Sequence, residues 1–579
     1  MEKNEDKVRV GMGITRMLKD YGVSKVFGIP DGHTLAFYDG ILQTDGIDHI
    51  LVNDERTAAF AADAYSRVTG GLGVCDAGAA GSMNFPVAIS EARGSGTPLL
   101  AIIGVIKKEH KLRNVPHDID VQGVIEPITK TCQSIYIPDQ VPRYVNYAIR
   151  MAKNGKPGPT ALIIPEDVMN SKELPLKRYI STKKGGSCAI EGCSIAPAAN
   201  EIENAVQMIR EAKQPAIFSG SQAVSSGAFT EIKKLADMLQ IPVFSTISGK
   251  GILQQEDPYY FGTVGLFGEK PNHKFIRRTA DLLIIIGNRM TEDDTANFKI
   301  PSSKMPVIQI DLDPGEIGLS FNAWGVVGDS KIALDMIIRR LQDEGLTRDR
   351  ESLESLMKER KRNLEELKQD HTEYWERDAA KWMDSEPIKP QRVLYSISQY
   401  FTEEDYLVTD ASASSRWIGP YFPVKGLGRK IITPRGVGPT GFGLGALLGT
   451  GIAIQDTYGE PTPKLVLLTG DGGLMNSGLS DLETIVQKEI NCTIVVLNNS
   501  ALGFVKFGQA MLYNRRYYDT DRVNTNFVQI AEAFGIKGKQ VKTISQLDEA
   551  IKSSLHNQKG VQLIDVITDP EEFLPPNSY

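Results

Sequence analysis

The sequence has 579 residues, of which 41% are hydrophobic and 24% charged, and its formal net charge is −7 at pH 7. A chain of this length exceeds what one hydrophobic core supports and predicts three domains of ordinary size. The acidic balance, without a basic block, argues against nucleic acid as a main partner. No apolar stretch reaches transmembrane length and the charged N-terminus lacks a signal-peptide core, so we expect no membrane partner.

Cysteine usage indicates the redox compartment. The five cysteines are odd in number and stand at unrelated positions, which predicts no disulfide framework. Cys188 and Cys193 lie in a Gly/Ser-rich segment with no set of His or Cys partners, which argues against a zinc site. We therefore expect a reduced, cytoplasmic protein.

Strands and helices alternate through the first 180 residues. Lys25–Ile29, Ile50–Val52 and Leu99–Val105 are apolar runs of strand length. The alanine-rich stretch Thr57–Val68 favours a helix. Alternation of this kind is typical of a parallel sheet covered by helices on both faces.

Two further segments repeat this α/β pattern. Four runs in the middle of the chain are expected to be strands, namely Ala216–Phe218, Val243–Ser245, Leu282–Ile286 and Val307–Ile310. Residues 181–200 have the composition of a linker, and the charge-rich residues 346–385 predict a solvated helical connector. The sequence thus predicts three doubly wound α/β domains over residues 1–180, 195–345 and 386–579, each with a mainly parallel sheet flanked by helices.

The third segment contains a strand–helix–strand unit with polar strand ends. Lys464–Gly470 leads into Gly470-Asp471-Gly472, and Thr493–Leu497 leads into Asn498-Asn499. A helix is expected between them, from the spacing of Leu479, Leu482, Ile485 and Val486. Because the carboxyl ends of parallel strands share one sheet edge, Asp471 and the Asn pair should converge.

The chemistry of that edge suits a metal and a diphosphate. One carboxylate and one carboxamide oxygen fit a hard cation such as Mg²⁺ that takes further ligands from phosphate. Glycines beside Asp471 allow the backbone to approach a diphosphate, and the following helix N-terminus supplies free N–H groups. Gly-Asp-Gly alone is a weak signal, since glycine turns recur by chance, but the Asn pair at the next strand end makes it specific.

GDG followed, after residues 473–497, by NN is the signature of thiamine diphosphate-dependent enzymes. Over about residues 8 to 570 the chain resembles the acetohydroxyacid synthase and benzoylformate decarboxylase branch of that family. The resemblance implies that Asp471, Asn499 and the carbonyl of Ala501 ligate Mg²⁺. It also implies cofactor contacts along the same edge from Gly470, Gly472, Gly473, Asn499, Ala501 and Gly503.

The resemblance places one catalytic acid in the first segment. The family has a glutamate after the second strand that holds a ring nitrogen of the cofactor's aminopyrimidine. Glu55 matches it through the strand before it and the alanine-rich helix after it. Taken alone, Glu55 would be an ordinary first-turn acid stabilised by the helix dipole.

Two more segments match cofactor-contacting turns. Gly436–Gly443 (GVGPTGFG) resembles the segment that grips the aminopyrimidine, with the carbonyl of Gly438 as acceptor. Thr440 stands where the family usually has a large apolar residue. Asp410–Ser414 (DASAS) resembles the diphosphate-contacting turn, which makes Ser412 and Ser414 candidate contacts. Glycine- or serine-rich turns that merely close a strand are the alternative for both.

Two histidines lie in loops that the family places near the cofactor. His33 follows Pro30-Asp31-Gly32, in which Gly32 is a candidate cofactor contact, and His117 stands where synthases commonly have Gln. A lone surface histidine is usually only solvated, yet both are candidates for catalytic proton handling.

The resemblance implies an acetolactate synthase-like carboligase that decarboxylates pyruvate and transfers the two-carbon unit to a second 2-oxo acid. The alternative is a decarboxylase or C–C hydrolase of another 2-oxo acid or 1,2-diketone, which His33, His117 and Thr440 favour because all three depart from the synthase pattern. The intact Glu55, Asp471 and Asn499 argue against a binding protein without turnover. No GxGxxG follows a predicted strand, which argues against an NAD-linked oxidoreductase.

The family also suggests a second cofactor and an assembly. Its synthases hold FAD in the middle domain near a Gly-x-Arg similar to Gly287-Asn288-Arg289, whereas other members have only a structural middle domain. The lack of GxGxxG here makes FAD the less favoured expectation. Because the family's glutamate and diphosphate-binding domain meet across a subunit interface, we expect a homodimer or homotetramer. The sequence does not identify a regulatory subunit.

Overall fold

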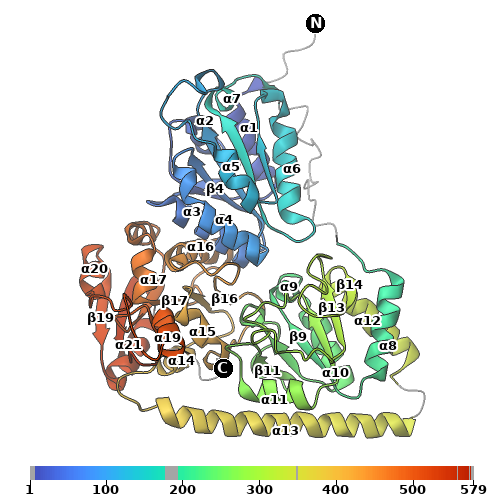
Figure 1. The fold of residues 1–579 in the computed structure, drawn as a ribbon. Coiled ribbons are helices and arrows are strands. Elements are labelled where there is room, and N and C mark those ends of the chain that lie inside the picture. The colour runs from blue at the N-terminus through green and yellow to red at the C-terminus, as the bar shows by residue number, and fades with distance from the viewer. Residues whose placement is uncertain (1–6, 176–193, 347–349, 557, 573, 575–579) are drawn as a thin grey trace. The chain divides into compact units, whose positions relative to one another are not determined.

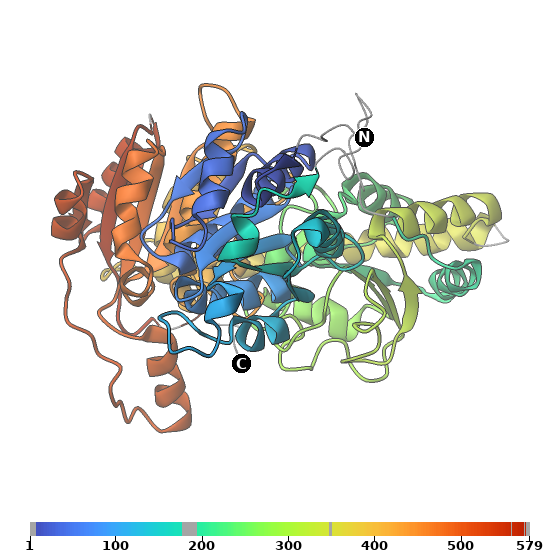
Figure 2. The same cartoon turned by 90° about the horizontal axis from the view of Figure 1, so that it is seen from above.

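The computed structural model describes residues 7–175, 194–346, 350–556, 558–572 and 574. The described residues form three six-stranded sheets, each flanked by helices (Figure 1, and Figure 2 from above). It forms two compact units, of which the first joins the N-terminal domain to residues 434–467 and 473–492. The second unit comprises residues 194–433, 468–472 and 493–579. Within the described residues, no helix has the length and apolar character that a membrane crossing requires.

The N-terminal sheet has the strand order β3-β2-β4-β5-β7-β6, and its strand pairs are parallel. Its strands are β2 (Lys25–Gly28), β3 (Asp48–Leu51), β4 (Gly73–Gly78), β5 (Leu99–Val105), β6 (Thr131–Ser134) and β7 (Pro159–Pro165). Its helices are α1 (Val10–Asp20), α2 (Leu35–Leu42), α3 (Glu55–Thr69), α4 (Pro86–Ser95), α5 (Val121–Ile125), α6 (Val141–Lys153) and α7 (Glu166–Met169). A short antiparallel pair of β1 (Lys7–Val8) and β8 (Leu174–Pro175) joins the two ends of this domain.

The central sheet has the order β11-β10-β9-β12-β13-β14, and its strand pairs are also parallel. Its strands are β9 (Pro215–Ser219), β10 (Val243–Ser245), β11 (Tyr260–Thr263), β12 (Leu282–Ile286), β13 (Val307–Asp311) and β14 (Trp324–Val327). Its helices are α8 (Ala199–Glu211), α9 (Ser221–Ser225), α10 (Phe229–Leu239), α11 (Lys270–Arg278) and α12 (Ser330–Glu344). Strands such as LLIII in β12 are buried throughout, as expected for a sheet covered on both faces.

The charged connector is one long helix, α13 (Arg350–Trp382), which runs alongside α11 (Figure 1). Its helical character confirms the sequence prediction, but it is not solvated all round. Leu364 and Leu367 are buried in the core of the central domain. Arg360 is also buried and donates to the carbonyls of Ala212, Lys213 and Leu239, so that this face of α13 anchors the helix.

The C-terminal sheet has the order β16-β15-β17-β18-β20-β19. Its strands are β15 (Tyr406–Thr409), β16 (Ile431–Ile432), β17 (Leu465–Gly470), β18 (Cys492–Asn498), β19 (Lys537–Val541) and β20 (Val561–Ile567). Its helices are α14 (Pro390–Ser398), α15 (Ala413–Tyr421), α16 (Phe442–Thr457), α17 (Asp471–Asn476), α18 (Leu482–Gln487), α19 (Gly503–Leu512), α20 (Phe527–Ala533) and α21 (Ile544–His556). The three parallel sheets confirm the predicted fold class.

The helix pair α3 and α16 packs unusually closely inside the first unit. Alanines dominate the facing side of α3, and α16 carries glycines opposite them. A Cβ atom at Gly449 would clash with the carbonyl oxygen of Ala61, and one at Gly445 would lie 2.7 Å from Cβ of Phe60. Small residues on both helices therefore let the two backbones approach each other.

The single helix expected around Leu479–Val486 is divided into α17, a 3₁₀ turn at Leu479–Asp481 and α18, because Asp481 is buried and accepts the backbone N–H of Asn53. The linker prediction for residues 181–200 lies mostly outside the described residues, as do Cys188 and Cys193.

Candidate active site

The predicted metal ligands lie at the carboxyl ends of adjacent strands in the second unit. β17 ends at Gly470 and β18 at Asn498, and the two strands are neighbours in the sheet. A Cβ atom at Gly470 would lie 4.0 Å from the carbonyl oxygen of Leu497, so the two strand ends are side by side. Asp471 follows directly as the first residue of α17 and is buried. The structure thus brings together the segments that the sequence predicts to converge.

The two asparagines after β18 have different surroundings. Asn498 is buried and donates from Nδ2 to Oδ1 of Asp565 at 3.0 Å. Asn499 is half-buried, and its Oδ1 accepts the backbone N–H of Ala501 at 3.2 Å. A Cβ atom at Gly503 would lie only 2.9 Å from Asn499 Nδ2, so glycine leaves room for this amide. Asn498 therefore supports the fold, and Asn499 retains acceptor capacity for a ligand.

The loop after Asn499 is held by backbone hydrogen bonds. Leu502 N–H donates to the Thr520 carbonyl and Arg522 N–H donates to the Ser500 carbonyl, both at 2.8 Å. These bonds place the guanidinium of Arg522 near Asp471, with 3.9 Å between Nε and Oδ2. Burial raises the pKa of Asp471 to about 6.

This set of donors fits the metal that the family implies. A buried carboxylate with one distant cation has an incompletely compensated charge, and a divalent cation would compensate it. Carboxylate, carboxamide and carbonyl oxygens are the ligands that Mg²⁺ prefers. The sequence also predicts that the helix after Asp471 attracts the diphosphate through its dipole. This helix, α17, has only six residues, so the attraction is weaker than that prediction implies.

The DASAS turn lies at the start of α15, also in the second unit. Ser412 precedes the helix with φ 65°, a left-handed conformation. Ser414 is buried, and its hydroxyl donates to the carbonyls of Asp410 and Ala411. The Ser414 oxygen can therefore accept a hydrogen bond while its own proton is engaged.

Glu55 lies in the first unit, at the first residue of α3. Asp54 caps this helix by accepting the backbone N–H of Arg56. The Glu55 carboxylate accepts from Asn84 Nδ2 at 2.9 Å, and a Cβ atom at Gly81 would clash with its Oε1. The carboxylate is thus fixed over a position where only glycine fits.

The two histidines come together in the same unit. Nδ1 of His33 lies 2.6 Å from Oδ1 of Asp31, and the His33 and His117 rings are 5.4 Å apart between centroids. His117 is exposed and has φ 67°, an uncommon value for a residue with a side chain. A Cβ atom at Gly78 would clash with the Asp31 carboxylate. The turn Gly78–Asn84 therefore has the Asp31–His33 pair at one end and Glu55 at the other.

The GVGPTGFG segment is held by an acid that sequence reasoning missed. Glu91, fully buried on α4, accepts the backbone N–H groups of Gly436, Val437 and Gly438 at 2.8 to 3.1 Å. Gly438 has φ 71° and is exposed, and so is Thr440, whose carbonyl accepts from Asn476.

Four supporting residues were not predicted from the sequence: Asp31, Asn84, Glu91 and Arg522. Asp31 stands beside His33 in the PDGH turn, and such an Asx-type position was the signal that could have identified it. No sequence signal indicates the other three. The partners of Asn84 and Glu91 are 29 to 347 residues away along the chain, and Arg522 faces Asp471 across a loop.

Comparison with known proteins adds to this geometry. Three family models match, described as the N-terminal thiamine pyrophosphate binding domain (residues 8–124), the central domain (residues 202–337) and the C-terminal thiamine pyrophosphate binding domain (residues 410–566). A probable acetolactate synthase large subunit of Methanocaldococcus jannaschii is 30% identical, with 97% of this chain and 92% of that protein aligned.

Two more relatives are similar over their full length. The probable acetolactate synthase large subunit of Methanococcus aeolicus is 29% identical over 98% of this chain and 94% of its own length. Acetolactate synthase isozyme 3 large subunit of Escherichia coli is 27% identical over 97% and 95%.

The chain has three doubly wound domains, and its N-terminal and C-terminal domains match cofactor-binding models. These features define an α/β enzyme that works with a bound organic cofactor. The chain belongs to the thiamine pyrophosphate enzyme family, in which it is acetolactate synthase-like, and thiamine diphosphate is its cofactor.

Proposed function

We propose that this enzyme decarboxylates pyruvate and transfers the two-carbon unit to a second 2-oxo acid, with Mg²⁺ as the metal. The observation that carries the proposal is the Glu55 carboxylate, fixed by Asn84 above Gly81 at the start of α3. The full-length similarity to acetolactate synthase large subunits supports this substrate class.

Glu55 has the first role in this proposal. Bound thiamine diphosphate supplies a carbon nucleophile for the keto carbon of the substrate and accepts the electron pair released with CO₂. Glu55 would hold a proton on the pyrimidine ring nitrogen and so favour the basic form of the opposite amino group. The hydrogen bond from Asn84 orients this carboxylate without adding a charge.

A second group of residues would hold the cofactor. Asp471, Asn499 and the carbonyl of Ala501 would ligate Mg²⁺, and the absence of side chains at the neighbouring glycines would admit the diphosphate. Further cofactor contacts are proposed for Gly32, Ser412, Ser414, Gly438, Thr440, Gly470, Gly472, Gly473 and Gly503. The exposed Gly438 carbonyl would accept from the 4′-amino group, since Glu91 already binds the N–H groups of that turn.

His33 and His117 are proposed to handle protons of the substrate. When Nδ1–H of His33 donates to Asp31, the tautomer is fixed and Nε2 is left as the basic nitrogen. Asp31 would then be a positioning residue. His117 is exposed and lies close to His33, and it would donate a proton to the substrate or accept one from it.

The Asp31–His33 pair also favours a second candidate function. Once Nε2 has taken up a proton, a carboxylate-oriented histidine can deliver it to a carbanion, which would end the reaction at decarboxylation or at C–C hydrolysis of another 2-oxo acid or 1,2-diketone. A carboligase instead delivers the same carbon to an acceptor carbonyl. The two functions differ in whether the product carbon gains a proton or a carbon bond.

Three finer points complete the proposal. FAD in the central domain remains the less favoured expectation, and the visible absorption spectrum of the purified protein tests it.

A homodimer or homotetramer is proposed from the family resemblance, and relatives named large subunits favour a second subunit, which co-purification tests. A cytoplasmic location is consistent with the buried free cysteines Cys75, Cys132 and Cys492.

Cofactor dependence tests the proposed activity. The protein would be stripped with a chelator and assayed for CO₂ release from pyruvate after adding back thiamine diphosphate and Mg²⁺, separately and together. We expect release only when both are present. Release without either component, from fully stripped protein, would refute the proposal.

A further inference from the structure

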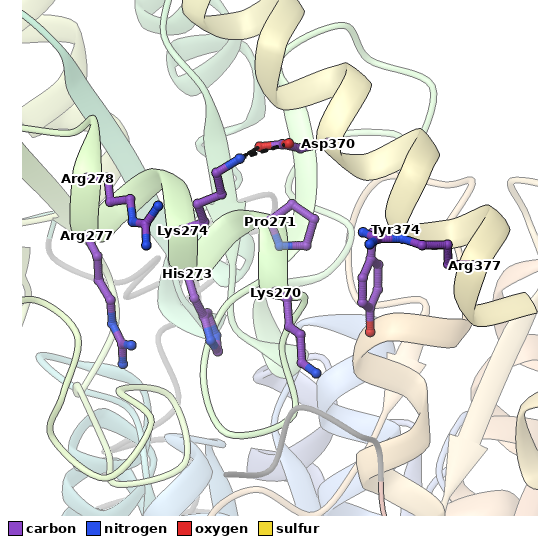
Figure 3. Close-up of a pocket in the computed structure, with 9 residues that line it drawn as sticks. All are labelled: Lys270, Pro271, His273, Lys274, Arg277, Arg278, Asp370, Tyr374 and Arg377. Atoms are coloured by element: carbon purple, nitrogen blue, oxygen red, sulfur yellow. Dashed lines mark hydrogen bonds and ion pairs between the residues drawn. The ribbon is translucent and has the colours of Figure 1, made fainter.

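A strongly basic pocket lies in the central domain between α11 and α13 (Figure 3). Its volume is about 500 Å³, which is in the range of small-molecule sites. The residues that line it are Lys270, Pro271, His273, Lys274, Arg277, Arg278, Asp370, Tyr374 and Arg377. No part of the proposed reaction uses this pocket.

The cations of the pocket are mostly uncompensated. Asp370, the acidic residue in the lining, is bound to Lys274 at 2.7 Å. Among the residues that the structure describes, no carboxylate forms an ion pair with Lys270, Arg277 or Arg278. The lining has five cations and one anion, on a chain whose net charge is −7.

Helical spacing concentrates these charges on one face of α11. Lys270, Lys274 and Arg278 are four residues apart, and Arg277 is seven residues after Lys270. Like charges at this spacing destabilise a helix by roughly 0.2–0.5 kcal/mol per pair. In Figure 3 the side chains of Lys270, His273 and Arg277 extend from α11 in the same direction. The helix dipole favours cations in the last turn, where Arg277 and Arg278 lie, but it does not account for Lys270 and Lys274 earlier in the helix.

His273 shows that the cations affect their surroundings. Its Nε2 accepts the backbone N–H of Gly265, which requires the ring to be unprotonated there. Burial and, next, the charge of Arg277 lower the pKa of His273 to about 4. The histidine therefore stays neutral beside the cations, and an anion in the pocket would meet no competing carboxylate except Asp370.

A second cavity, of about 390 Å³, shares Tyr374 with the basic pocket. Four aromatic side chains line it, with Trp375, Tyr421 and Phe422 beside Tyr374. Glu269 in its lining lies 3.2 Å from Nδ1 of His371, and Lys250 also lines this cavity. A cationic cavity and an aromatic cavity thus meet at one tyrosine.

We propose that the two cavities form a site for a nucleoside di- or triphosphate. The phosphates would bind Lys270, Arg277, Arg278 and Arg377, because arginine forks match phosphate oxygens. The base would stack in the aromatic cavity, whose rings can pack on a flat heterocycle. This site is separate from Gly287-Asn288-Arg289, where the sequence suggested FAD, and its binding does not depend on the proposed reaction.

Calorimetric titration of the full-length protein tests the proposal. Thiamine diphosphate and Mg²⁺ are kept saturating so that the catalytic diphosphate site is filled, and ADP, ATP, tripolyphosphate and adenosine are titrated in turn. We expect ATP and ADP to bind, tripolyphosphate to bind at least tenfold more weakly than ATP, and adenosine to bind weakest. No binding of ATP or ADP, or equal affinity for ATP and tripolyphosphate, would overturn the proposal.

Variants of the lining residues test whether the nucleotide binds in these two cavities. Arg277→Gln/Arg278→Gln should weaken ATP binding at least tenfold, whereas Lys361→Gln/Lys368→Gln removes the same charge from exposed positions of α13 and should leave it unchanged. Trp375→Ala should weaken ATP binding but not tripolyphosphate binding. Circular dichroism melting confirms that each variant is folded. Equal ATP affinity in the arginine variant and in the lysine control would contradict the assignment.

Discussion

Glu55 is the residue on which the catalytic proposal depends most. Replacing it with Gln retains its shape and its contact with Asn84 but removes the acid. We expect turnover of Glu55→Gln to fall by at least about 100-fold, the lower range for loss of a positioned acid or base. Cofactor affinity, measured by calorimetry, should stay near that of the wild type.

The control for this variant is Glu166→Gln, which changes another first-turn acid of the N-terminal domain. It should have wild-type turnover. A Glu55→Gln enzyme as active as this control would show that Glu55 is only a helix first-turn acid.

Lys250 gives a pH-dependent prediction at the residue scale. Its ammonium group is buried, donates to the carbonyl of Gly419, and has a pKa lowered by burial to about 8 from an ordinary 10.5. Between these values the unfolded chain binds more protons, so stability of the wild type should rise with pH. Lys250→Met has no titrating amine at this position, so its stability should not show this rise with pH.

The difference in free energy of unfolding, Lys250→Met minus wild type, should therefore decrease between pH 7 and pH 9.5, as measured in urea. Lys299→Met, at an exposed position, serves as the control and should show a constant difference. A constant difference for Lys250→Met as well would mean that the amine is not desolvated.

At the scale of elements, α3 and α16 can pack closely because glycines of α16 have no side chains where they face α3. A Cβ atom at Gly449 would clash with the Ala61 carbonyl oxygen, so the helices must separate. We expect Gly449→Ala to destabilise the protein by about 1–3 kcal/mol, the range for overpacking a core. Chemical denaturation measures this change.

Gly459→Ala is the matched control, because no atom lies within 4 Å of a Cβ atom at that position. Its stability should be within roughly 0.5 kcal/mol of the wild type. Equal stability of the two variants would show that the helices are not in close contact.

The sequence predicts strands better than it predicts side-chain pairs. Leu99–Val105 and Leu282–Ile286 form strands with the expected bounds, because continuous apolar runs suit a sheet buried on both faces. The segment Leu479–Val486 breaks because a tertiary contact of Asp481 overrides its helical spacing. The partner of Glu91 at Gly436 is 345 residues away, and only folding brings it near.

At the scale of the whole molecule, we propose that Glu55 and Asp471 of one active site come from different chains. Glu55→Gln and Asp471→Ala, each nearly inactive alone, would be co-expressed with different tags and purified for both. A mixed dimer should then have one intact site and about half of wild-type activity per dimer. Absence of any recovery in the mixed dimer would refute a shared site.

The identity of the product tests the central claim most directly. Purified protein would be incubated with pyruvate, thiamine diphosphate and Mg²⁺, and the products analysed by mass spectrometry, with and without FAD. We predict acetolactate, formed by transfer of the two-carbon unit to a second pyruvate. Acetaldehyde alone, or no consumption of pyruvate, would contradict the carboligase and make His33 and His117 the next residues to change.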